Sequence, residues 1–363
     1  MLKSLCTAAL ICAAAVSARA ADELASLKET SPKLSAAGPL AFGPQGILFV
    51  GDAKQAAIFA IATGDKAGRS ADAKLNVEDL GKKVAALLGT EPGDILINDL
   101  AVNPASGNAY LSVSRGRGPD AAAVIVRIDT AGKLSELSLA KAAYSKAALP
   151  NAPAPGGKGR SNKRRDSITD LAYVDGRVFV AGLSNEEFAS KLRSIPFPFK
   201  SAGKGTSVEI FHGAHGRFET RSPIRTFATY KIGDDDHLLA AYTCTPLVKF
   251  PISKLVPGVK LKGTTIAELG NHNRPLDMIV YNKGGKDYIL IANSSRGLMK
   301  VTTEKIGEIE GIEKRVSGTA GLTYEKIAEI EGVVQLDRFD AKNALVIVKA
   351  KDGTQSLKTI ALP

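Results

Sequence analysis

The sequence predicts an all-β chain folded as a β-propeller, and three observations lead to this prediction. Short apolar strands recur as hairpins joined by Gly- or Asp-containing turns. These hairpins repeat along nearly the whole chain, and long helical patterns are missing between them. Radial repetition of small sheets explains this pattern, because each sheet covers its neighbour and leaves few exposed edges. We expect six blades, and seven if one blade is degenerate.

The repeating unit is an innermost strand, a turn and a second strand. Five clear copies begin at Leu40, Asn98, Thr169, Asp277 and Val334, and a less regular sixth runs from Ile224 to Tyr242 with a third strand at Pro246–Phe250. The spacing between copies is uneven, so insertions between blades are expected. A β-sandwich is the alternative fold, but six or more hairpins overfill one.

The N-terminus reads as a secretory signal peptide covering residues 1–20. Lys3 is the positive residue, an apolar run follows from Leu5 to Val16, and Ala18-Arg19-Ala20 fits a small-x-small cleavage site near Ala20. The apolar run is shorter than the roughly 20 residues that a membrane span needs. We therefore expect a secreted or periplasmic protein without a transmembrane segment, in which residues 21–363 form a single propeller domain.

Two insertions interrupt the predicted strands. The first is a Pro/Gly-rich loop at 150–166, expected to be a solvated loop or an anion-docking loop. Its basic residues are Lys158, Arg160, Lys163, Arg164 and Arg165. The second, at 184–200, is predicted as a short helix over 185–193, because Phe188 and Leu192 are four residues apart, followed by an aromatic loop at 195–199. This is the one short helical insertion in the predicted fold.

Two blade motifs carry a resemblance to known propellers. Phe42-Gly43-Pro44-Gln45-Gly46-Ile47-Leu48-Phe49-Val50-Gly51-Asp52 resembles the start of NHL-type and gluconolactonase-like blades. Ile97-Asn98-Asp99-Leu100-Ala101-Val102 is similar to the Asn-Asp blade entry of gluconolactonase and paraoxonase-like propellers. The resemblance implies six blades and a calcium ion held in the central channel by Asn, Asp and Glu side chains.

Three aspartates occupy the same place in three blades. Asp99, Asp170 and Asp277 come just before the innermost strand, so we expect them at the central channel or its rim. Carboxylates gathered there repel one another unless a cation or a basic residue lies among them, and Ca²⁺ suits several oxygen ligands. Asn98 and Asn273 are candidates for neutral oxygens. In the alternative interpretation each aspartate accepts backbone N–H groups as a structural residue of its own blade turn.

The histidines and arginines suggest a second site. His272 precedes a blade, where it is the candidate general base, and together with Arg274 and Arg225 it suits an anionic ligand. His215 is a further candidate ligand-binding residue. It follows His212 by three residues, and on a strand such a pair points to opposite faces, so only a turn brings both to one ligand.

The composition and the absence of several motifs limit the possible functions of the protein. The formal net charge of +11 favours anionic small molecules, anionic polysaccharides or acidic proteins, and for an exported chain we expect no nucleic-acid partner. The sequence has no G-x-S-x-G, H-E-x-x-H, P-loop or dinucleotide motif. We therefore predict an exported, monomeric propeller that binds its ligand or partner through channel-mouth loops. The alternative is a calcium-dependent hydrolase or lactonase, with the metal polarising a carbonyl and His272 as base.

Overall fold

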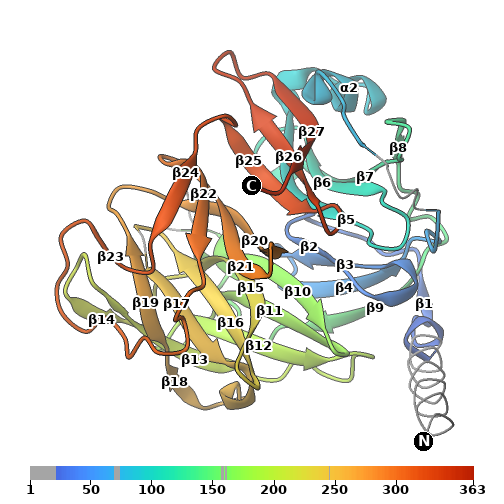
Figure 1. The fold of residues 1–363 in the computed structure, drawn as a ribbon. Helices are drawn as coiled ribbons and strands as arrows, with labels where there is room; N and C mark the ends of the chain where they lie inside the picture. The colour runs from blue at the N-terminus through green and yellow to red at the C-terminus, as the bar shows by residue number, and fades with distance from the viewer. Residues whose placement is uncertain (1–21, 69–73, 157–158, 160–161, 245) are drawn as a thin grey trace, which may run out of the picture.

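Six mainly antiparallel sheets surround a central channel in the computed structural model (Figure 1). The structure describes residues 22–68, 74–156, 159, 162–244 and 246–363. The predicted signal peptide therefore lies outside the described residues. The all-β, six-bladed architecture predicted from the hairpin repeats is confirmed. In the described residues, no helix is sufficiently long and apolar to span a membrane.

The three inner strands of each blade form an antiparallel meander, and the innermost strand borders the channel. From the channel outward, blade 1 consists of β2 (Leu40–Phe42), β3 (Ile47–Asp52), β4 (Ala57–Ala62), β9 (Ala143–Ala148) and β1 (Glu29–Thr30). Blade 2 consists of β5 (Ile95–Val102), β6 (Ala109–Arg115), β7 (Ala122–Ile128) and β8 (Leu134–Glu136). Blade 3 consists of β10 (Asp170–Val174), β11 (Arg177–Leu183), β12 (Ser190–Pro196), β13 (Thr206–His212) and β14 (Arg217–Glu219), with β18 (Lys260–Lys262) parallel to β13.

The other three blades follow the same plan. Blade 4 consists of β15 (Ile224–Ile232), β16 (Asp235–Tyr242), β17 (Pro246–Pro251), β19 (Thr264–Leu269) and β23 (Thr319–Gly321). Blade 5 consists of β20 (Pro275–Lys283), β21 (Lys286–Asn293), β22 (Gly297–Thr302) and β24 (Tyr324–Ile327). Blade 6 consists of β25 (Val333–Arg338), β26 (Asn343–Lys349) and β27 (Gln355–Ala361).

Short helices occur in the connections. The α-helix α2 (Leu80–Leu87) packs near blades 2 and 6. The 3₁₀ turns are η1 (Pro44–Gly46), η2 (Pro92–Asp94), η3 (Gly118–Asp120), η5 (Lys163–Asp166) and η6 (Ile252–Lys254).

The order of the blades around the ring differs from their order in the sequence. The innermost strand β2 contacts both β5 and β10, and β25 contacts β5. Blade 1 therefore lies between blades 2 and 3, as the blue sheet between the cyan and green sheets shows (Figure 1). After three strands of blade 1 the chain builds blade 2, and then returns to add β9 beside β4.

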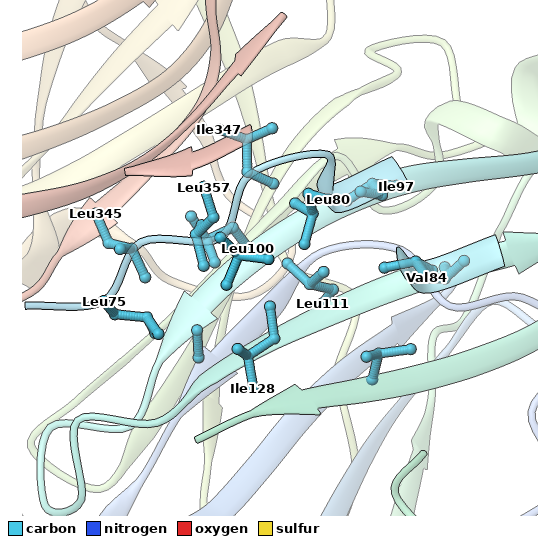
Figure 2. Close-up of a cluster of buried hydrophobic side chains, with 14 of the residues drawn as sticks. Leu75, Leu80, Val84, Ile97, Leu100, Leu111, Ile128, Leu345, Ile347 and Leu357 are labelled. Carbon is cyan, nitrogen blue, oxygen red and sulfur yellow. The ribbon is translucent and has the colours of Figure 1, made fainter. Parts of the chain in front are cut away.

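The core lies between the blades. All six residues of β3 are buried, because the middle strands of a blade are covered on both faces. Figure 2 shows one such interface, where Leu345 and Ile347 of β26 and Leu111 of β6 gather with Leu80 and Val84 of α2. Burial of apolar surface contributes about 25 cal/mol per Å² to the free energy of folding. These contacts between blades are therefore the main source of stability.

The ring is closed by a segment that precedes α2. Val77 forms a β-bridge with Leu357 of β27. Nearby, the backbone N–H of Leu75 donates to Thr359 Oγ1 at 2.8 Å, and the N–H of Thr359 donates to Asn76 Oδ1 at 2.9 Å. Blade 6 has three strands of its own, so a segment from the first quarter of the chain covers its outer strand.

The helix predicted over 185–193 is wrong. Residues from Ser190 onward form β12, in which Leu192 pairs with Ala181 and is fully buried. Phe188 lies in the preceding turn, beneath the ammonium group of Lys260 at 3.8 Å from the ring centre. Phe188 and Leu192 are therefore four residues apart across a turn and the start of a strand. A strand buried on both faces lacks the period-2 pattern that would have distinguished it from a helix.

Candidate functional site at the channel and its mouth

The innermost strands bring the three predicted aspartates together at the channel. Asp99 lies in β5, Asp170 opens β10 and Asp277 lies in β20, so they are inside these strands rather than just before them. In β5 and β20 a register irregularity immediately precedes the aspartate. A fourth carboxylate, Asp337 of β25, joins them; it was missed, although it belongs to the copy that begins at Val334.

Each aspartate connects its own strand to the next innermost strand. Their Oδ2 atoms accept backbone N–H groups of the neighbouring blade at 2.7–2.9 Å. The pairs are Asp99 with Leu40, Asp170 with Phe227, Asp277 with Leu336 and Asp337 with Val102. The Oδ1 atom of Asp170 also accepts the N–H of Leu171 in its own strand. The aspartates thus fasten four of the six blade boundaries.

Burial dominates the electrostatics of this aspartate ring. It raises the pKa of Asp170 to about 7 and that of Asp337 to about 6, against the N–H hydrogen bonds that favour the charged forms. Burial also raises the pKa of Asp99 and Asp277 well above the usual range, and repulsion among the carboxylates adds to it. The ring therefore gains protons readily near neutral pH.

The ring is a wide one for a single cation. Two oxygens at about 2.4 Å from one Ca²⁺ lie at most about 4.8 Å apart. In the described residues, no three of these carboxylates come that close to one another. Asn98 donates from Nδ2 to Ala37 O and Ser114 Oγ, and Asn273 Oδ1 accepts from Asn293, so both predicted amides have structural partners.

A cluster of arginines lies at the mouth where the innermost strands begin. The guanidinium of Arg225 donates from Nη1 to Asp166 Oδ1 at 2.9 Å and from Nε to Thr243 Oγ1 at 3.0 Å. Asp166 ends η5, in the predicted basic loop, and Arg225 lies at a register shift of β15. Arg274 immediately precedes β20, so three separate segments converge here.

The cluster has more positive than negative charge. Burial lowers the pKa of Arg274, the nearby Arg225 and Arg165 lower it further, and Asp166 opposes them. Arg274 therefore lies near two other guanidinium groups and one carboxylate, and that carboxylate already pairs with Arg225. In the part of the chain that the structure describes, the Arg274 side chain has no ion-pair partner.

The predicted base His272 lies beside the arginine cluster but does not join the aspartates. Its side chain is exposed, its backbone adopts a left-handed φ of 57°, and its carbonyl oxygen accepts from Ser295 Oγ at 2.8 Å. Within the described residues, no carboxylate hydrogen-bonds to its imidazole. An exposed imidazole at the mouth suits contact with a ligand better than proton transfer inside the channel.

The basic loop is partly anchored to the ring. Arg164 donates from Nε to Ala53 O at 2.9 Å and from Nη1 to Pro153 O at 2.8 Å, so it holds the loop against blade 1. Arg165 is part of the arginine cluster. Lys158 and Arg160 lie outside the described residues.

His215 lies in the hairpin between β13 and β14. His212 Nδ1 is 3.2 Å from Glu219 Oε2, and His215 Nδ1 is 2.6 Å from Glu219 Oε1. Burial tends to raise the pKa of Glu219, but its hydrogen bonds with both histidines and with Ser222 hold it well below the usual range. Two signals for this hairpin are present in the sequence, the flanking glycines and the carboxylate four residues after His215.

A separate pocket of about 300 Å³ opens between blades 3 and 4. It lies at the opposite ends of the innermost strands, near Val174 and Lys231, and Arg177 and Asp236 line it. None of the predicted site residues contributes to its lining. The mixed charges that line this pocket do not indicate a particular ligand.

Comparison with known proteins adds no function to this architecture. No protein-family model and no curated protein matches the sequence. Among solved structures, PQQ-bound aldose sugar dehydrogenase from Streptomyces coelicolor is 12% identical over 92% of this chain and 95% of the other, with a TM-score of 0.35. A putative oxidoreductase (glucose dehydrogenase) from Thermus thermophilus is 13% identical over 92% and 98%, also with a TM-score of 0.35.

The extracellular region of plexin A4 is similar over 91% of this chain but only 47% of its own length, at 9% identity and a TM-score of 0.41. Likenesses at this level carry no information about ligand or reaction. By its own sheet topology the protein is a six-bladed β-propeller.

Proposed function

We propose that the protein is an exported propeller that binds an anionic ligand at the channel mouth, through Arg225, Arg274 and Arg165. The observation that supports this function is the excess of guanidinium over carboxylate around Arg274. Guanidinium forks recognise carboxylates, sulfates and phosphates through paired N–H donors. Arg274 provides the main contact with the ligand, because Arg225 already donates to Asp166 and Thr243.

An acidic polysaccharide is the ligand class that we favour. The chain carries an excess of positive charge, and the basic loop and the arginine cluster border the same mouth. A polymer with repeated anionic groups extends over such a surface and makes several weak contacts at once, whereas a single small anion occupies one contact site. Export, predicted from residues 1–20, would bring the protein to such polymers.

Binding to polygalacturonate and heparin tests this proposal, with neutral dextran as the uncharged probe. Arg274→Gln should weaken binding of at least one acidic polymer by about tenfold or more, since charge-assisted hydrogen bonds contribute roughly 1.5–3 kcal/mol. Arg338→Gln is the matched control, because it removes the same charge from the last residue of β25, at the other end of an innermost strand. Equal weakening by both variants, or no binding of either polymer, would contradict the proposed site.

A calcium-dependent hydrolase or lactonase is the second candidate function. It is supported by the four buried carboxylates of the aspartate ring, whose raised pKa values a cation would lower. Such an ion would be held by at most two of these carboxylates, with carbonyl groups or water completing its coordination. No histidine stands at the ring in the described residues, so a base for this reaction is not assigned.

Elemental analysis of protein purified without chelator tests the calcium candidate. About one calcium per chain, together with a lower Tm in EDTA, would support it, because a ligand bound to the folded state stabilises that state. Absence of calcium together with an unchanged Tm would make the ring a purely structural feature.

A further inference from the structure

A tight turn brings two histidines together beside blade 3. The backbone N–H groups of His215 and Gly216 both donate to the carbonyl of His212, at 3.1 and 2.8 Å, and Gly216 adopts a φ of 65° that favours glycine. The chain reverses within these residues, so the two imidazole rings lie with centroids 3.8 Å apart. On a continuous strand they would have pointed to opposite faces.

The returning strand adds a carboxylate to this pair. β14 runs antiparallel to β13, and its last residue, Glu219, has both oxygens directed at the histidines, at 3.2 and 2.6 Å from the Nδ1 atoms of His212 and His215. One ligand atom from each residue lies within 4.8 Å of the other two. Ligand atoms of a tetrahedral Zn²⁺ at about 2.0–2.1 Å are about 3.4 Å apart, so small side-chain movements suffice.

The surroundings hold the carboxylate of Glu219 in place and leave one ring nitrogen of His212 without a hydrogen-bond partner. Ser222 Oγ donates to Glu219 Oε2 at 2.5 Å. His212 is only 3% exposed, and its Nε2 atom is buried without a hydrogen-bond partner. A buried polar atom without a partner is unfavourable in a folded protein, so this imidazole is not present merely to fill the core.

We propose that His212, His215 and Glu219 form a binding site for a divalent transition-metal ion of the Zn²⁺ class. Two imidazole nitrogens and one carboxylate suit Zn²⁺ rather than Ca²⁺, which prefers oxygen ligands alone. Three protein ligands leave a fourth position for water or a small anion. The side chain of His215 is 45% exposed, so the ion is reached from solvent on that side.

One neighbouring cation must move aside when the metal binds. The guanidinium Nε of Arg217 is 3.5 Å from Glu219 Oε1 and would repel an ion there. Its side chain is 71% exposed, so it can rotate into solvent at little cost.

Titration of the whole metal-free chain with Zn²⁺ by calorimetry tests the site. We expect one Zn²⁺ per chain, unaffected by excess Ca²⁺. His215→Ala and Glu219→Gln should each weaken the affinity by more than the roughly 10–100-fold that loss of an outer partner costs. Glu136→Gln is the matched control for Glu219→Gln, since Glu136 is an exposed carboxylate in β8 of blade 2, and this variant should bind Zn²⁺ as the wild type does.

Circular dichroism melts of the same variants show whether they fold. His215 is the decisive position, because its exposed side chain is removed without opening the core. Wild-type affinity in His215→Ala, or no stoichiometric Zn²⁺ in the wild-type chain, overturns the proposal. A pink-to-blue Co²⁺ spectrum in the wild type that is absent in a folded His215→Ala variant supports it.

Discussion

At the scale of single residues, hydrogen bonding and burial have opposite effects on the charged form of the channel aspartates. Asp170 accepts the N–H groups of Leu171 and Phe227, and so joins two blades. Its burial near other carboxylates makes the charged form costly, and its pKa rises to about 7. The contacts between blades therefore depend on groups whose charge changes near neutral pH.

The raised pKa of Asp170 predicts a pH-dependent stability. Its folded-state pKa of about 7 exceeds the ordinary value of 3.8, so the folded state binds the proton more tightly. The resulting stabilisation is fully present below about pH 4 and is lost as the pH rises to about 7. We expect the free energy of unfolding, measured with urea, to fall between about pH 4 and about pH 7.

Asp170→Asn should reduce this fall in the free energy of unfolding. Asparagine carries no titratable group, so the contribution of Asp170 to the pH dependence is removed in the variant. Asp129→Asn is the control, because Asp129 accepts N–H groups in a turn between β7 and β8, outside the channel. An unchanged pH dependence in Asp170→Asn would refute the role assigned to this carboxylate.

At the scale of elements, close packing of loops against strands limits what the blades tolerate. Gly182 of β11 faces the loop that enters blade 3, and a Cβ atom there would lie 2.1 Å from the carbonyl oxygen of Ser167. Gly81, in α2, has free space around it, since a Cβ atom there would lie 3.7 Å from its nearest neighbour atom. The two glycines are therefore present for different reasons.

Alanine substitutions should separate these two glycines. Gly182→Ala should lower the free energy of unfolding by about 1–3 kcal/mol, because the backbone of Ser167 must shift. Gly81→Ala should raise it by roughly 0.5–1 kcal/mol, because glycine loses more conformational entropy in a helix than alanine does. Thermal and urea unfolding measure both; equal effects at the two positions would show that the close approach at Gly182 is unimportant.

The near-repeat Glu-Lys-Ile-x-Glu-Ile-Glu-Gly adopts two different structures. In the copy at 304–311 the segment forms a turn after β22, and Ile306 packs between blades 4 and 5. In the copy at 325–332 the first residues belong to β24, and Ile327 packs between blades 5 and 6. Each copy thus anchors one side of blade 5 with its first isoleucine, although the backbone conformations differ.

At the scale of the whole molecule, closure of the ring depends on contacts between distant parts of the chain. Leu357 of β27 bridges to Val77 and is fully buried among residues of blade 2 and α2 (Figure 2). A propeller whose last blade is loosely held opens at that boundary first, because neighbouring blades stabilise one another mainly through their shared interface.

Leu357→Ala should weaken this closure. Removal of the buried side chain should cost about 2–5 kcal/mol of unfolding free energy, and hydrogen exchange should accelerate first in blade 6. Leu96→Ala is the matched control, since Leu96 is 57% exposed and its loss should change stability by less than about 0.5 kcal/mol. Uniform acceleration of exchange across all blades would argue against a distinct closure point.

The sequence by itself determined the blades, since hairpin turns and strand periodicity depend on residues close together in the chain. It predicted the turns at Asp175 and Gly233, and it placed Asp99, Asp170 and Asp277 at the channel. It failed at 185–193, where burial on both faces removed the pattern that separates a strand from a helix.

Only the tertiary structure decided which distant residues meet. The position of blade 1 between blades 2 and 3, the approach of Arg225 to Asp166 and the addition of Asp337 to the ring join segments far apart in sequence. The meeting of His212 with Glu219 is local, yet it depended on a turn whose geometry the residue types alone left open. Contacts between distant segments follow from the packing of the whole ring, because the local propensities of the residues do not determine them.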